Sequence, residues 1–369
     1  MPELYIGLMS GTSLDGVDGV LADFSQSSAR VIAHAGAAFP ADLRAELLAL
    51  NTAGDNELHR AALAGNALTR VYSQVVHELL KHAGASPSSV EAIGAHGQTV
   101  RHRPQEFDGT GYTIQLCQPA LLAELTGITV AADFRSRDVA AGGQGAPLAP
   151  FFHQAMFRRT GESVGVLNIG GISNLTLLRA DGSMIGFDCG PGNSLMDAWC
   201  ASHKGQDFDA GGAWAASGQV VTPLLQSLTA EPFFGKAPPK STGRDLFNHA
   251  WLQAHLQAFA TANAADVQAT LAELTARVCS GDVLRHEPGL RRLIVCGGGA
   301  LNSHLMTRLQ SLLPGVHVAS SAEFGLPPLQ VEATAFAWLA RKAVRREKLE
   351  LKSTTGAKGA RVLGCVYPA

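Results

Sequence analysis

Apolar and polar positions form a strand, turn, strand pattern at the start of the chain. Leu4 to Met9 is an apolar run, Ser10 to Gly16 consists mostly of Ser, Gly, Thr and Asp, and Val17 to Phe24 partly alternates between apolar and polar residues. Short apolar runs bounded by turn residues are typical of strands. We therefore predict two strands joined by a tight turn.

The next part of the chain has apolar residues at helical spacing. From about Asn56 to His82 the apolar residues recur at the period of a helix, and Gly84 is a stop signal. The same part of the chain predicts shorter helices at Ala41 to Leu50 and Pro119 to Thr126, and strands at Val90 to Ala95 and Ile128 to Ala132. Such a mixture of strands and helices indicates an α/β domain.

The strand, turn, strand pattern restarts near the middle of the chain. Val164 to Asn168 and Leu175 to Leu178 are apolar and flank a Gly-containing turn, and a third strand is predicted at Met184 to Asp188. Later elements are predicted as helices within Thr222 to Arg285, strands at Arg292 to Cys296 and Val316 to Ala319, and a last helix from Gln330 to Arg346. Two units that begin in the same way suggest two α/β domains of similar plan.

Composition narrows the classes of function. The chain has 369 residues, more than one hydrophobic core usually serves, and 46% of them are hydrophobic against 16% charged. Its 29 Lys and Arg nearly balance its 31 Asp and Glu, which gives no electrostatic reason to expect nucleic acid as a partner. A basic cluster near the C-terminus is interpreted as a solvated helix face; it consists of Arg341, Lys342, Arg345, Arg346 and Lys348.

The start of the chain and the cysteines indicate a cytoplasmic protein. No signal peptide is evident in the sequence, and no apolar stretch is long enough to span a bilayer. The six cysteines are scattered, without the spacing of a zinc site or of a Cys-x-x-Cys pair. We therefore expect reduced thiols and no membrane partner.

Two Gly-containing turns are candidate phosphate-binding sites. The first lies in Gly7 to Asp18, where backbone amides and the hydroxyls of Ser10, Thr12 and Ser13 could donate to phosphate oxygens. It is not a P-loop, because it lacks Gly-Lys-Ser/Thr and precedes a strand rather than a helix. The second lies in Asn168 to Asn174. Each could be a simple polar hairpin, but two such turns, one per domain, could hold a triphosphate from both sides.

Asp188 ends a predicted strand and precedes a Gly-Pro-Gly loop that leads to a helix. A carboxylate in this position could accept a proton from a nucleophile. The helix start at Asn193 or Ser194 could add N–H donors for an anion. Alternatively, Asp188 could fix the loop through hydrogen bonds to its amides, and the sequence leaves both roles open.

Further Gly-rich and polar segments could bind a base or a substrate. Gly297 to Gly299 could let a flat ring such as adenine lie on the backbone, or could form a tight turn with Asn302 as a helix cap. Glu332 opens the last predicted helix, where an acidic residue also suits the helix dipole. Polar residues near strand ends suit substrate hydroxyl, amide and carboxylate groups, although they could also pair with one another; these are His96, Gln98, Arg101, His102, Asp133, Arg135, Arg137 and Asp138.

Together these segments resemble the anhydro-N-acetylmuramic acid kinase family over essentially the whole chain. The motifs that carry the resemblance are Gly7 to Gly16, Ala95 to Val100, Ala132 to Arg135 with Gly142 to Pro147, Asn168 to Asn174, and Phe187 to Asn193. The resemblance implies an α/β fold of two actin-like (ribonuclease H-like) domains, with mixed sheets flanked by helices and a nucleotide cleft between them. We expect the domains to span 1–130 plus 341–369, and 131–340.

The resemblance also implies an ATP-dependent kinase of bacterial cell-wall recycling that uses Mg²⁺. In the family's reaction, water attacks the anomeric carbon of 1,6-anhydro-N-acetylmuramic acid and opens the anhydro bridge. The oxygen released at position 6 then takes the γ-phosphoryl group, so that the products are N-acetylmuramic acid 6-phosphate and ADP. The metal ligands stay unknown, and a homodimer stays open.

The resemblance assigns roles to individual residues. Asp188 would be the general base for the attacking water, and Glu332 would help hold that water or the sugar. The nucleotide would be bound by Gly11, Thr12, Ser13, Leu14, Asp15, Gly16, Val17 and Asp18, and by Gly170, Gly171, Gly297, Gly298 and Gly299. The sugar site would be lined by His96, Gln98, Asp133 and Arg135.

Three other functions stay open from the residues alone. The chain could be a kinase for a different small sugar or carboxylate, an actin-like nucleotide switch that polymerises or clamps a protein partner, or a carbohydrate-binding protein without catalysis. The loop at Asp188 and the polar cluster favour an enzyme over a switch. A binding protein would leave two phosphate-type turns without a use.

Overall fold

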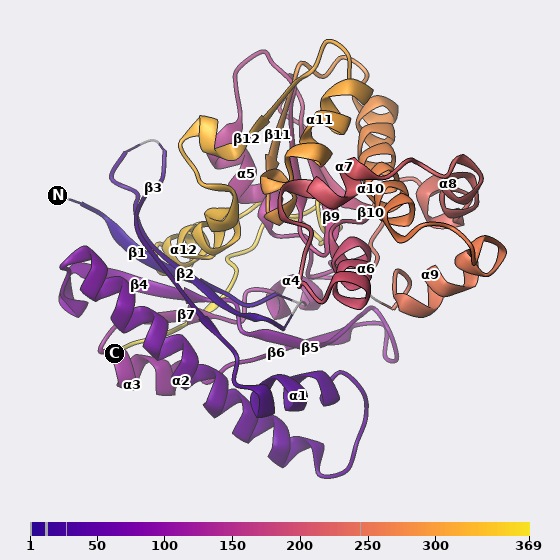
Figure 1. The fold of residues 1–369 in the computed structure, drawn as a ribbon. Helices are drawn as coiled ribbons and strands as arrows, with labels where there is room; N and C mark the ends of the chain where they lie inside the picture. The colour runs from indigo at the N-terminus through magenta and orange to yellow at the C-terminus, as the bar shows by residue number, and fades with distance from the viewer. Residues whose placement is uncertain (1, 12–13, 27, 244) are drawn as a thin grey trace. The chain divides into compact units, whose positions relative to one another are not determined.

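The computed structural model describes residues 2–11, 14–26, 28–243 and 245–369, and it divides into two units (Figure 1). The first unit comprises Met1–Met156 and Gln330–Ala369, and the second comprises Phe157–Leu329. Each unit has one mixed sheet flanked by helices, which confirms the predicted fold class of two α/β domains.

The first unit contains a six-stranded sheet and a separate two-stranded sheet. Its strands are β1 (Leu4–Met9), β2 (Gly16–Asp23), β3 (Arg30–Ala38), β4 (Val90–Ala95), β5 (Gln98–Pro104), β6 (Gly111–Leu116), β7 (Val130–Ala132) and β13 (Cys365–Tyr367). Its helices are α1 (Ala41–Ala49), α2 (Glu57–Ala83), α3 (Pro119–Thr126), α4 (Ser136–Ala140), α5 (Ala149–Phe157), which ends at the unit boundary, and α12 (Val331–Val344). The predicted helix stop at Gly84 is confirmed, since Gly84 is left-handed and its amide donates to the carbonyls of Leu80 and Lys81.

The second unit is built on a five-stranded sheet. Its strands are β8 (Val164–Ile169), β9 (Ile172–Leu178), β10 (Met184–Pro191), β11 (Arg292–Cys296) and β12 (His317–Ser320). Its helices are α6 (Ser194–Lys204), α7 (Ala213–Ser217), α8 (Thr222–Thr229), α9 (His249–Leu256), α10 (Ala264–His286) and α11 (Ser303–Leu312). Helix α10 is buried along most of its length and packs against α7, α8 and α11.

The two main sheets share one strand order. The large sheet runs β13-β7-β4-β1-β2-β3, and the sheet of the second unit runs β10-β9-β8-β11-β12. In each sheet the first strand pairs antiparallel with the second, the second antiparallel with the third, and the first parallel with the fourth. This repeated ribonuclease H-like order is the one expected for the two units, with β13 added antiparallel to β7 at the edge of the first.

Helix α12 lies directly on the first sheet because two paired glycines leave room for it (Figure 1). Gly7 of β1 and Gly94 of β4 are register partners. A Cβ atom on Gly7 would lie 1.8 Å from the Ala333 carbonyl oxygen, and one on Gly94 would lie 2.0 Å from the Phe336 carbonyl oxygen. This packing places Glu332 in the first unit.

The unit boundaries therefore differ from the expected ones. Residues 131–156 and 330–340 lie in the first unit rather than the second. The physical reason is that β7 pairs with β4, and that α12 packs against β1 and β4 already at Ala333 and Phe336 rather than only beyond residue 340. Among the described residues, no helix is long and apolar enough to cross a bilayer.

Candidate functional site

A buried cluster around His96 lies at the end of β4 in the first unit. Two nitrogens of the Arg135 guanidinium lie 3.0 Å and 3.3 Å from His96 Nε2. Because a guanidinium can only donate, Nε2 is the acceptor and the ring proton sits on Nδ1, which donates to the Ser10 carbonyl at 3.0 Å. Burial, together with the charge of Arg135, lowers the pKa of His96 to about 3, so the ring is neutral at physiological pH.

Arg135 connects this cluster to α12 and to the glycine-rich segment after α4. Its Nη1 donates to the Gly145 carbonyl at 2.8 Å. Burial lowers the pKa of Arg135 to about 10, while the nearby carboxylates of Glu332 and Asp138 act in the opposite direction. The Phe336 ring lies 4.7 Å from the His96 ring. The structure thus brings together the predicted residues His96, Arg135 and Glu332.

Gln98 lies beside the first Gly-containing turn. Its Nε2 donates to the Gly11 carbonyl at 3.0 Å. Its Oε1 is buried and, within the described part of the chain, has no hydrogen-bond partner. A buried unpaired acceptor is costly unless a ligand or water satisfies it, so this oxygen is a candidate contact for a substrate hydroxyl.

The first Gly-containing turn ends one residue before its expected end at Gly16, and the strand predicted from Val17 is confirmed. Gly16, Val17 and Asp18 lie in β2 and pair with β3. A Cβ on Gly16 would lie 2.3 Å from the Ala37 carbonyl oxygen, so close strand packing, rather than a turn conformation, accounts for this glycine.

Within the turn itself, Leu14 is left-handed and buried, and its amide donates to the Gly11 carbonyl at 3.3 Å. The Asp15 carbonyl accepts from the Phe39 amide at 3.2 Å. The predicted phosphate-binding residues Thr12 and Ser13 lie outside the described residues.

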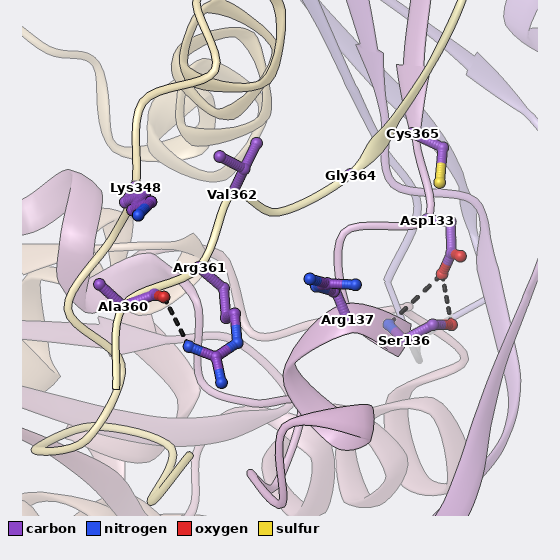
Figure 2. Close-up of a pocket in the computed structure, with 9 residues that line it drawn as sticks. All are labelled: Asp133, Ser136, Arg137, Lys348, Ala360, Arg361, Val362, Gly364 and Cys365. Carbon is purple, nitrogen blue, oxygen red and sulfur yellow. Dashed lines mark hydrogen bonds between the residues drawn. The ribbon is translucent and has the colours of Figure 1, made fainter. Parts of the chain in front are cut away.

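Asp133 lies apart from the cluster around His96. It is exposed and left-handed, and its Oδ1 accepts from the Ser136 hydroxyl at 2.5 Å. It lines a pocket of 720 Å³ that includes Arg137 and Arg361 but not His96, Gln98 or Arg135 (Figure 2). We call this the basic pocket.

In the second unit, Asp188 is held by a segment distant in sequence. Its Oδ2 accepts from the Ser241 hydroxyl and from the Thr242 amide, both at 2.9 Å, and its own amide donates to the Lys240 carbonyl at 3.0 Å. Burial raises the pKa of Asp188 and outweighs the opposing effects of these hydrogen bonds and of the Lys240 charge. A held carboxylate with a raised pKa is well suited to accept a proton.

The loop after Asp188 is fixed by other side chains. The Ser173 hydroxyl lies 3.2 Å from the Gly190 carbonyl and 3.3 Å from the Pro191 carbonyl. The Thr275 hydroxyl lies 3.1 Å from the Pro191 carbonyl and 3.0 Å from the Gly192 carbonyl. The carbonyls of this loop are thus held by Ser173 and Thr275, while Asp188 Oδ2 accepts from the Ser241 and Thr242 segment.

Lys240 forms a buried ion pair that the sequence did not indicate. Its Nζ lies 2.9 Å from Asp282 Oδ2, and the two side chains are 2% and 3% exposed. The ammonium also lies 5.6 Å from the Phe187 ring centre and 5.1 Å from that of Phe233. This pair anchors the segment that holds Asp188, but its partners are 42 residues apart, so no local pattern could have identified it.

The second Gly-containing turn packs against the start of α6. The amides of Gly192 and Asn193 donate to the carbonyls of Gly171 and Gly170 at 2.9 Å and 2.7 Å, and the Ser194 amide donates to Gly171 at 3.2 Å. These three amides are thus engaged by the turn. The expectation that the helix start supplies donors for an anion can therefore apply only to amides beyond Ser194, and there it stays a prediction.

The three glycines Gly297 to Gly299 pack against the same turn. Gly297 is left-handed, and a Cβ there would lie 2.4 Å from Asn168 Oδ1. A Cβ on Gly299 would lie 2.4 Å from the Ile169 side chain. The structure therefore brings Gly297–Gly299 and Gly170–Gly171 together, and the predicted cap is confirmed because Asn302 Oδ1 accepts from the Leu305 amide at 3.0 Å.

The chain matches one family along nearly its full length. The family model for anhydro-N-acetylmuramic acid kinase covers residues 3–369. A protein of that name from Variovorax paradoxus (strain S110) is 66% identical over 372 residues, covering 100% of this chain and 99% of its own. Another from Albidiferax ferrireducens is 60% identical over 389 residues, covering 100% of each chain. Among solved structures, a ROK family glucokinase from Streptomyces griseus in complex with glucose and AMPPNP aligns with TM-score 0.42 and 12% identity, over 92% of this chain and 99% of that chain.

Proposed function

The chain belongs to the anhydro-N-acetylmuramic acid kinase family, and we propose that it opens 1,6-anhydro-N-acetylmuramic acid with water and phosphorylates the product from ATP. The family match over residues 3–369 carries this proposal. The reaction yields N-acetylmuramic acid 6-phosphate and ADP, and it belongs to the recycling of bacterial cell wall.

In this proposal Asp188 is the general base. It takes a proton from water as the water oxygen bonds to the anomeric carbon and the bond from that carbon to the bridging oxygen breaks. The freed oxygen at position 6 then bonds to the γ-phosphorus, and ADP leaves. The support is geometric, because Ser241 and Thr242 both hold Oδ2, while burial makes the carboxylate more basic than usual.

The sugar is bound by His96, Gln98, Asp133 and Arg135, and Glu332 helps hold the water or the sugar. Arg135 supplies a fixed cation, since His96 and Gly145 set the direction of its guanidinium. Gln98 supplies the buried Oε1, which can accept from a sugar hydroxyl. Asp133 differs from the other three, because it lines the basic pocket and its carboxylate accepts from the Ser136 hydroxyl.

ATP is bound through both Gly-containing turns. The residues assigned to it are Gly11, Thr12, Ser13, Leu14, Asp15, Gly16, Val17, Asp18, Gly170, Gly171, Gly297, Gly298 and Gly299. Mg²⁺ would neutralise the charge of the β- and γ-phosphates. Mg²⁺ commonly uses one or two protein carboxylates with phosphate and water oxygens. Among the described residues, no group of three or more His, Cys, Asp or Glu is placed to hold a metal ion.

We further propose that the protein works in the cytoplasm, with a small amino sugar rather than nucleic acid as its partner. The six cysteines are free thiols, which supports a reducing compartment. The near balance of 29 basic and 31 acidic residues gives no large positive field for a polyanion.

A coupled ADP-release assay with ATP, Mg²⁺ and 1,6-anhydro-N-acetylmuramic acid tests the proposal, with mass spectrometry of the sugar. A product that has gained one water and one phosphate is expected. Turnover only with another sugar would show that the protein is a kinase but that its substrate differs from the proposed one. No ADP release with any sugar, or ADP release only in response to protein concentration, would favour the nucleotide switch instead.

A further inference from the structure

The basic pocket of the first unit carries three cationic side chains to which the proposed kinase reaction gives no role. Arg137 comes from α4, Lys348 follows α12, and Arg361 lies in the C-terminal segment (Figure 2). Asp133 is the one carboxylate in the lining. The volume of 720 Å³ is that of a small-molecule site rather than of a single bound ion.

These three cations differ from the basic residues that precede them in the chain. Arg341 and Arg345 both pair with Glu3, and Lys342 pairs with Glu347. Across the described ranges, Arg137, Lys348 and Arg361 form no ion pair, and the Arg361 side chain donates only to the Ala360 carbonyl, at 2.8 Å. The pocket therefore concentrates unneutralised positive charge in a protein of formal net charge −2.

The walls of the basic pocket are held together by hydrogen bonds. Leu349 and Arg361 exchange two backbone hydrogen bonds, of 2.8 Å and 3.1 Å, which fix Arg361 beside the segment that carries Lys348. On the other wall, the fully buried Asp138 accepts from the Thr355 hydroxyl at 2.5 Å. These contacts tie the C-terminal segment to α4, where Arg137 is the neighbour of Asp138.

Figure 2 shows Arg137 on α4 and Arg361 on the C-terminal segment on either side of the space between these elements, with the Arg361 guanidinium turned to the Ala360 carbonyl. The carboxylate of Asp133 is turned to Ser136 instead, and its Oδ1 accepts from that hydroxyl. Arginine forks match the geometry of phosphate oxygens, and a lysine adds a mobile point charge. The remaining lining, which includes Val362 and Cys365, can contact the body of a ligand.

We propose that the basic pocket binds a phosphomonoester of a small molecule, with its phosphate between Arg137 and Arg361. Such a ligand would act next to the proposed sugar site. Arg135 is two residues from Arg137 and donates to the Gly145 carbonyl, and the Gly145 amide donates to Asp138 at 2.6 Å. The product of the proposed reaction is itself a phosphomonoester, and this one candidate ligand rests on the proposed function.

Isothermal titration calorimetry of the full chain without ATP tests the pocket. The probes are N-acetylmuramic acid 6-phosphate, glucose 6-phosphate and inorganic phosphate, with glucose as the uncharged control. The variants are R137A and R361A, with R361K to keep the charge and R44A as a matched control, since Arg44 is an exposed arginine of α1. Thermal melts of each variant establish that it is folded.

We expect phosphomonoesters but not glucose to bind, and R137A and R361A to weaken binding at least about tenfold, as the loss of a charge-assisted hydrogen bond does. R44A should leave the affinity unchanged, and R361K should lose less than R361A. Tighter binding of N-acetylmuramic acid 6-phosphate than of glucose 6-phosphate identifies the reaction product as the ligand. Equal affinities identify a site for sugar phosphates in general.

Equal affinity in the wild type, R137A and R361A would overturn the proposal, because the ligand would then bind elsewhere. Failure of every probe to bind at millimolar concentration would also overturn it. Neither result depends on turnover, so a failure of the proposed kinase reaction would be seen separately, in the ADP-release assay of the same preparation.

Discussion

The two units have sheets of the same strand order but opposite electrostatics at their candidate site residues. In the first unit, a cation is held against a neutral histidine, and burial lowers the pKa of that histidine to about 3. In the second unit, a carboxylate is held by a hydroxyl and an amide, and burial raises its pKa. One fold plan can therefore present either a fixed positive charge or a basic carboxylate, depending on which side chains its strand ends carry.

The largest expected effect comes from removing the carboxylate of the second unit. Asp188→Asn should lower turnover on the order of a hundred- to ten-thousand-fold, as the loss of a general base does, while ATP binding is retained. Steady-state kinetics and nucleotide titration measure the two effects. Asp207→Asn is the control, since Asp207 is an exposed residue of the same unit. Unchanged turnover in D188N would refute the assignment.

Breaking the ion pair behind Asp188 should have the largest effect on stability. Lys240→Met removes the ammonium partner of the buried Asp282, which keeps the half-exposed Arg285 at 3.3 Å. The loss of unfolding free energy should therefore approach, but stay below, the about 3–5 kcal/mol of an uncompensated buried charge. Urea unfolding measures the loss. K240M/D282N removes both charges and should recover part of it. If the double variant is less stable than K240M, the pair is not what limits stability.

Removing Arg135, the cation held against His96 in the first unit, should weaken binding of the sugar. Arg135→Met leaves His96 Nε2 and the Gly145 carbonyl without this donor and removes the charge proposed to face the sugar. We expect KM for the sugar to rise roughly ten- to a hundredfold, with little change in KM for ATP. R44M is the control, and an equal rise in both KM values would contradict a role confined to the sugar.

Lowering the pH should change the contributions of buried groups in the two units to the free energy of unfolding in opposite directions. Burial lowers the pKa of both His96 and His153 to about 3, so the stability they contribute is complete above pH 6.5 and is lost as the pH falls toward 3. Each should cost roughly 1 kcal/mol per pH unit in that range. Asp188 has a raised pKa, so its contribution is present at low pH and is lost as the pH rises through its folded value.

Urea unfolding between pH 7 and pH 4 tests this prediction. His153→Gln removes one of the two buried histidines and should flatten the loss of stability at low pH. D188N should steepen it slightly, because the opposing contribution of Asp188 disappears. An unchanged pH profile in H153Q would show that His153 does not titrate as its burial requires.

Local signals in the sequence predicted much of this structure. The strand at Leu4–Met9, the stop at Gly84 and the cap at Asn302 depend on residues within a few positions, and the structure shows all three. The two edge strands of the first sheet were missed, because β3 is built largely of small residues and β13 has only three residues. The unit boundary was displaced, because the packing of α12 is set by Gly7 and Gly94, far away in the chain.

Chemistry that depends on long-range contacts could not be predicted from the sequence. Asp188 was singled out by its position at a strand end, but Ser241 and Thr242, which hold its carboxylate, are 53 and 54 residues away. The same holds for Lys240 and Asp282. In the first unit, the polar residues His96 and Arg135 were identified, whereas their direct contact, across 39 residues, was one alternative among several.

The glycine pair beneath α12 sets the depth at which that helix sits. With a methyl group at Gly7 or Gly94, α12 could not keep its present height above the sheet, and Glu332 and Phe336 would rise with it. Catalytic geometry is sensitive to displacements of about 1 Å, which can cost on the order of a hundredfold in rate. Gly7 and Gly94 thus determine the position of two residues near the proposed sugar site although neither glycine has a side chain to contact the sugar. Substitutions at these two positions should therefore be tolerated as poorly as substitutions in the site itself.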